Sequence, residues 1–73
     1  MNLLAKHFTF EYIVLKHGVP PQRIPFLKKV YTDNSHSLIV LRNKLIELGL
    51  NKAEMTAILT YHGAVIAGVA IPQ

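Results

Sequence analysis

Residues 37–62 read SLIVLRNKLIELGLNKAEMTAILTYH, and this stretch decides the fold. Its first half places leucines at the spacing of one helix face, which predicts a buried stripe made of Leu38, Leu41, Leu45 and Leu48. Ser35 or Ser37 can cap the start of this helix. Gly49 follows it, and glycine readily takes the left-handed conformation that ends a helix. The pattern therefore predicts a helix over about 37–48.

A second helix is predicted directly after this turn. Asn51 is followed three residues later by Glu54, an arrangement like a capping box, in which each side chain accepts a hydrogen bond from the other residue's backbone. The inner face of this helix would carry Met55, Ile58, Leu59 and His62. Together, residues of about 37–48 and 52–62 form a predicted helical hairpin.

The tail after Gly63 is apolar from Ala64 to Ile71 and has no polar face. We expect it to be buried, as a third short helix or as a strand. Its eight residues are too few for a membrane span, which needs about 20. We therefore expect a cytosolic protein without a membrane contact.

Residues 3–16 support two interpretations. Phe8, Phe10 and Tyr12 alternate with polar residues, which is the period of a strand that could pair, over residues 8–15, with a strand in the tail. In a helix, the residues that share one face would be Leu3, Leu4, His7 and Phe8. A proline-rich connector follows at 17–25, and Pro25 can begin a short helix over 25–31.

Composition favours one small globular domain. The chain has 73 residues, of which 51% are hydrophobic and 16% charged, which is too short for two domains and too apolar for a disordered chain. It has no cysteine, which excludes disulfides and thiolate metal sites. We predict a mainly α protein, a single domain over residues 1–73 with the helical hairpin and a short N-terminal strand or extended arm. Residues 1–16 are a candidate docking arm.

The sequence offers no sign of catalytic or metal-binding machinery. No two of the four histidines have the i, i+4 spacing of a helical zinc site, and no glycine-rich phosphate loop occurs. Ser35 and Ser37 flank His36, but helix capping explains both serines. We expect no enzyme, no catalytic residue, no metal and no cofactor.

Positive charge is concentrated in the first half of the chain. The net charge is +4, and residues 1–32 carry five basic residues against one acid, whereas 33–73 carry three of each. This asymmetry predicts an acidic partner, either a protein surface or nucleic acid. Aromatic residues lie among these cations, as in many docking surfaces. We predict partner contacts by Leu3, Leu4, Phe8, Phe10 and Tyr12. We predict contacts to nucleic acid or an acidic surface by Lys6, Lys16, Arg23, Lys28 and Lys29.

An alternative interpretation is a small basic nucleic-acid-binding protein with a helix-turn-helix rhythm over residues 41–69. Its reading helix would be Ala64–Val69, which lacks any side chain that could hydrogen-bond a base edge. Sequence-specific DNA binding by this half is therefore the weaker hypothesis, and protein binding fits the first half better.

The whole chain resembles the small RNA-polymerase-binding transcription regulators of lytic Xanthomonas phages. The resemblance lies in the length, the lack of cysteine, the opening MNLLAKHFTFEYIVLKHGVPPQR and the tail AILTYHGAVIAGVAIPQ. It implies a protein that acts in the host bacterial cytoplasm, inhibits transcription initiation and promotes antitermination. It also implies binding to the N-terminal part of the polymerase β′ subunit near the RNA exit channel, where RNA or upstream DNA could be contacted. We expect the protein to be a monomer.

Overall fold

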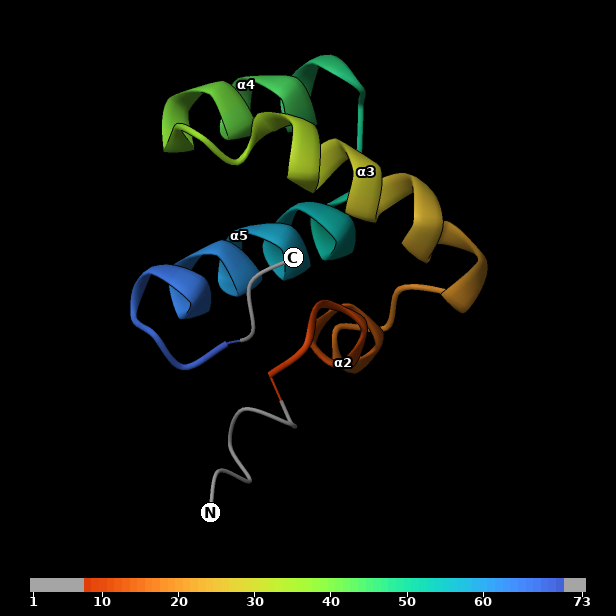
Figure 1. The fold of residues 1–73 in the computed structure, drawn as a ribbon. Helices are drawn as coiled ribbons and strands as arrows, with labels where there is room; N and C mark the ends of the chain where they lie inside the picture. Colours follow the sequence, from red (N-terminus) through yellow and green to blue (C-terminus); the bar gives the residue numbers. More distant parts are fainter. Residues whose placement is uncertain (1–7, 71–73) are drawn as a thin grey trace.

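The computed structural model describes residues 8–70, and over this range the chain is built from helices. Four α-helices and one 3-10 helix follow one another: α2 (Phe10–Lys16), η1 (Pro21–Arg23), α3 (Ile24–Asn34), α4 (Leu38–Glu47) and α5 (Lys52–Ile66). Helix α5 lies in the middle, with α2 on one side and the α3–α4 pair on the other (Figure 1). The prediction of a mainly α domain is confirmed.

The helical hairpin is present and its caps are the predicted ones. The Ser37 hydroxyl accepts a hydrogen bond at the start of α4, and Gly49 follows the helix with a φ of 69°. The backbone N–H of Glu54 donates to Asn51 Oδ1 at 2.8 Å, and the backbone N–H of Asn51 donates to Glu54 Oε1 at 3.3 Å. These contacts satisfy amides that the first turn of a helix otherwise leaves unpaired.

The end of the hairpin differs from the prediction. Helix α5 continues through Gly63 to Ile66, and the chain then turns at Gly68 with a φ of 79°. A glycine inside a helix costs about 1 kcal/mol, but Ala64 and Val65 pack against the core, which outweighs that cost. The expectation that the whole tail is buried is wrong, because Ile66 is 71% exposed. Residues 64–70 form neither a separate helix nor a strand.

The alternation at residues 8–15 does not produce a strand. Residues 10–16 form α2, whose start is capped by the Thr9 hydroxyl, which accepts from the Tyr12 N–H at 3.1 Å. Phe10, Ile13 and Val14 are buried at helical spacing against α5, so burial of this face selects the helix. Residues 1–7, with the predicted contact residues Leu3, Leu4 and Lys6, lie outside the described residues.

The connector and the third helix follow the proline signals. Helix α3 begins beside Pro25, as predicted, but ends at Asn34 rather than at residue 31. It is longer because Leu27, Val30 and Tyr31 form a buried face, and its last turn stays helical beyond them. The Asn34 side chain donates to the Val30 carbonyl oxygen at 2.8 Å in that last turn.

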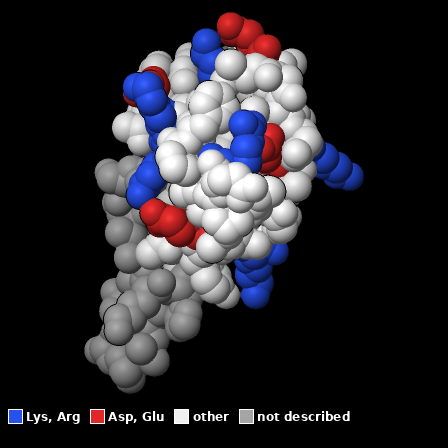
Figure 2. All heavy atoms as spheres, turned by 90° about the vertical axis from the view of Figure 1, so that its right-hand side faces the viewer, with Lys and Arg blue, Asp and Glu red and all other residues white. Residues whose placement is uncertain are grey.

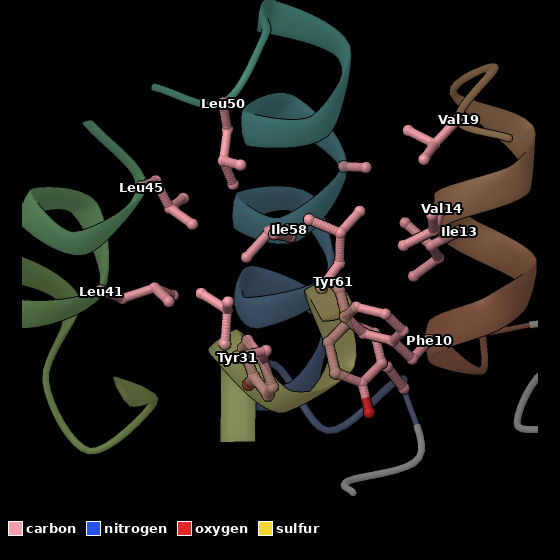
Figure 3. Packing of buried hydrophobic residues seen from close by; sticks show 14 residues of the cluster. Phe10, Ile13, Val14, Val19, Tyr31, Leu41, Leu45, Leu50, Ile58 and Tyr61 are labelled. Carbon is pink, nitrogen blue, oxygen red and sulfur yellow. The ribbon is translucent and has the colours of Figure 1, made fainter. Parts of the chain in front are cut away.

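The core lies where α2, α3 and α5 meet (Figure 3). The ring centroids of Phe10 and Tyr31 each lie 5.1 Å from the ring centroid of Tyr61, in edge-to-face geometry. From α4, Leu41 and Leu45 reach this core and are fully buried. The other two leucines of the predicted stripe, Leu38 and Leu48, are exposed. Helix α4 therefore packs along a narrower stripe than its sequence predicts.

Candidate functional site: two surface grooves

Most of the predicted cationic contact residues that the structure describes are held by carboxylates. Arg23 Nε lies 2.6 Å from Glu54 Oε2, and Lys28 Nζ lies 2.6 Å from Glu11 Oε2. Lys29 pairs with Asp33 at 3.2 Å. On the face drawn in Figure 2, basic side chains stand apart, several beside an acidic one. The basic side chains on that face therefore do not merge into one patch.

Two of these pairs differ in their surroundings. Glu54 is buried, and the hydrogen bond from Arg23 holds the pKa of its carboxyl below its usual value although burial opposes this. Glu11 is only partly buried, and its hydrogen bond from Lys28 likewise lowers its pKa. Arg23 also lies over the Phe26 ring, 5.0 Å from the centroid. Arg23 thus links η1 to α3 and α5, which is a role in the fold.

A groove between α2 and α5 gathers three of the predicted contact residues. This α2–α5 groove is lined by Phe8, Tyr12, Ile13, Lys16, His17, Thr60 and Ala64. The rings of Phe8 and Tyr12 meet edge to face at 6.3 Å. Lys16 Nζ lies 3.4 Å from Tyr12 Oη and 5.5 Å from the centre of the Tyr12 ring. The groove thus presents an apolar surface with one cation at its edge.

Helical geometry explains this grouping. Phe8, Tyr12 and Lys16 recur every four residues and so lie along one side of α2 and the residues before it. Phe10 lies on another side, is 2% exposed and belongs to the core. The prediction that Phe10 contacts a partner is therefore wrong for the folded protein. A strand would have placed Phe10 on the same face as Phe8 and Tyr12, whereas the helix places it in the core.

A second groove was missed by the sequence reasoning. This α4–α5 groove is lined by Arg42, Leu45, Ile46, Lys52, Met55, Thr56 and Leu59. Next to it, Ile39 is 70% exposed, and Ile46 on its rim is 65% exposed. The sequence does contain a signal for this groove, since Ile39 and Ile46 lie outside the leucine stripe of the same helix. A single exposed apolar residue is normal, but several that lie together, as Ile46, Met55 and Leu59 do here, indicate an interaction surface.

The buried polar groups belong to the core and not to a site. Tyr31 Oη and His62 Nδ1 are joined by a hydrogen bond of 2.9 Å, and both residues are buried. Burial raises the pKa of Tyr31 and brings that of Tyr61 to about 12. Across residues 8–70, every buried side-chain nitrogen or oxygen has a hydrogen-bond partner, and no group of three His, Asp or Glu residues could hold a metal ion.

Comparison of the chain with protein-family models, curated protein sequences and solved structures finds no match. None of the helices in residues 8–70 combines the length and apolarity that crossing a membrane requires. The chain's own residues, and the resemblance described above, therefore carry the functional inference.

Proposed function

We propose that the protein binds bacterial RNA polymerase and thereby inhibits transcription initiation and promotes antitermination. The resemblance implies the partner, the N-terminal part of its β′ subunit and the host cytoplasm as the place of action. We propose that the protein acts as a monomer. The observation that carries the proposal is the α2–α5 groove, which brings Phe8, Tyr12 and Lys16 together on the surface. Aromatic side chains beside a cation are typical of residues that dominate protein interfaces.

The groove supports docking in two ways. A partner side chain placed in it would bury the exposed parts of Phe8 and Tyr12, which is favourable because apolar area leaves water. Among residues 8–70, no carboxylate pairs with Lys16, whose ammonium group lies beside Tyr12, so an acidic residue of the polymerase could approach it. Docking would inhibit initiation if it opposed the shape change of promoter opening. It would promote antitermination if it disfavoured an RNA hairpin in the exit channel.

The paired cations have different roles within this proposal. Arg23 and Lys28 hold carboxylates of the fold. The Lys29–Asp33 pair is exposed on both sides, and such pairs contribute little, so Lys29 can exchange Asp33 for a partner group at small cost. Lys16 and Lys29 are thus the cations we propose for an acidic surface, or for RNA or upstream DNA within the complex.

The alternative function is that of a small helix-turn-helix-like nucleic-acid-binding protein. It would need a separate reading helix after the turn at Gly63, and α5 instead runs without interruption from Lys52 to Ile66. The pairing of Arg23, Lys28 and Lys29 also reduces the number of cations free for phosphates. Nucleic-acid binding is therefore the outcome that the test below must separate from polymerase binding.

The test is an affinity measurement with purified core polymerase, using Tyr12→Ala and a matched control, Leu15→Ala. Both residues are exposed on α2, but only Tyr12 lines the groove. We expect Tyr12→Ala to weaken binding about tenfold, which corresponds to the loss of one interface anchor, and Leu15→Ala to leave it unchanged. Circular dichroism would verify that both variants fold.

Gel shifts with duplex and single-stranded nucleic acid at two salt concentrations complete the test. Polymerase retained without a shift of free nucleic acid would support the proposal. A salt-sensitive shift without polymerase retention would overturn it in favour of the nucleic-acid-binding alternative.

A further inference from the structure

Helix α4 presents an apolar face that the core does not use. Ile39, Arg42 and Ile46 stand at positions i, i+3 and i+7 and therefore share one side of the helix. Both isoleucines are more than half exposed, whereas Leu41 and Leu45 alone anchor α4 in the core. Beside this face, the α4–α5 groove continues the apolar surface onto α5 through Met55 and Leu59.

The charges around the groove are of one sign. The sequence has four acidic side chains, and each already faces a cation elsewhere: Glu11 with Lys28, Asp33 with Lys29, Glu47 with Lys44, and Glu54 with Arg23. Arg42 and Lys52 are both exposed, both line the groove, and neither has an ion pair among the described residues. The chain has no further acidic side chain to offer them.

We propose that the α4–α5 groove binds an acidic amphipathic helix of a partner protein. The apolar side of that helix would cover Ile46, Met55 and Leu59, and its carboxylates would meet Arg42 and Lys52. Binding of an amphipathic helix in an apolar groove is a common recognition mode, and the two cations set the charge that the partner must carry. The groove shares no residue with the α2–α5 groove, so this second interaction uses a different surface from the one proposed for polymerase docking.

Other occupants fit the same surface less well. A second copy of this chain, related by a two-fold axis, would place Arg42 and Lys52 of both copies near one another without a carboxylate between them. Nucleic acid would satisfy the cations but would leave the apolar lining against a phosphate backbone. A membrane surface is flat, whereas this site is concave and formed by two helices.

The experiment uses a fluorescein-labelled helical peptide of about four turns, with leucines along one face and glutamates beside them. A twin peptide has glutamine at each glutamate position. Fluorescence anisotropy should give an affinity for the glutamate peptide about fivefold higher than for the twin, as expected for two exposed ion pairs. Amide chemical-shift changes in the full chain should map to Arg42, Ile46 and Leu59.

Variants assign the effect to the groove. The double variant Arg42→Gln/Lys52→Gln should lose the preference for glutamate, and Ile46→Gln should weaken both peptides. Lys16→Gln removes one exposed cation from the other groove and should leave peptide binding unchanged. Because Lys16→Gln acts on polymerase retention and Arg42→Gln/Lys52→Gln on the peptide, failure of one proposal can be told from failure of the other.

Several results would overturn this inference. They are shift changes confined to the α2–α5 groove, an unchanged glutamate preference in the double variant, and binding only to duplex DNA or to phosphatidylglycerol vesicles. A dimer detected by sedimentation, and dissociated by Ile46→Gln, would also overturn it.

Discussion

Replacing Tyr31 with Phe removes one hydroxyl from the centre of the molecule. That hydroxyl lies 2.9 Å from His62 Nδ1, and the two residues are 4% and 7% exposed. Water therefore has little access to the ring nitrogen that would be left alone. Leaving a buried polar atom unpaired costs about 1–3 kcal/mol, and the burial here favours a value of about 2 kcal/mol.

This loss is large for a chain of this size. A domain of 73 residues has a free energy of unfolding of roughly 4–11 kcal/mol. For small domains each kcal/mol lowers the melting temperature by roughly 4–8 °C, so Tyr31→Phe should lower it by about 8–16 °C. Urea and thermal unfolding followed by circular dichroism would measure both quantities.

A double-mutant cycle tests the reason for the loss. His62→Leu alone should also destabilise the protein, since it leaves the Tyr31 hydroxyl unpaired. The combination Tyr31→Phe/His62→Leu removes both polar partners and should cost less than the sum of the single changes. Tyr12→Phe is the control. The hydroxyl of Tyr12 is on the surface, so its removal should change the free energy of unfolding by less than about 0.5 kcal/mol. Additive single changes, or a Tyr31→Phe protein as stable as Tyr12→Phe, would refute the reasoning.

Three further predictions concern stability. Gly63→Ala should raise the free energy of unfolding by about 0.5–1 kcal/mol, because an added Cβ on this exposed helical residue meets nothing within 4 Å. Gly49→Ala should lower the free energy of unfolding by about 1 kcal/mol, because φ is +69° at this position. Urea titrations that reverse this order would contradict both predictions. Leu41→Ala, at a fully buried site, should cost about 2–5 kcal/mol by the same measurement, and a cost below 1 kcal/mol would mean that α4 is not anchored there. The pKa values of Glu11 and Glu54 are lowered on folding, so the folded state binds fewer protons than the unfolded state. The stability from these groups should be fully present above the unfolded pKa of 4.5 and should fall as pH drops through the folded pKa values. Urea midpoints that stay constant between about pH 5 and pH 3 would exclude this linkage.

The local signals of the hairpin were readable from the sequence. Ser37, Gly49, Asn51 and Glu54 act on backbone groups within a few residues of themselves, so their spacing alone predicts where α4 ends and α5 begins. Composition likewise indicated a small globular domain. Phe8 and Tyr12 were predicted as partner contacts and Lys16 as a contact to nucleic acid or an acidic surface, but the groove that brings the three together was not predicted.

Only the tertiary structure decided the remaining features, since they depend on partners that are distant in the sequence. The aromatic alternation at 8–12 favours a strand locally, yet packing of Phe10, Ile13 and Val14 on α5 makes this segment a helix. The charge imbalance of the first half is locally real, but Arg23 meets a carboxylate 31 residues away and Lys28 one 17 residues away. Since these carboxylates are already paired, Arg42 and Lys52 stay without one and are the cations of the α4–α5 groove. Burial and charge pairing depend on distance in space and not on distance along the chain, so the sequence alone could not predict them.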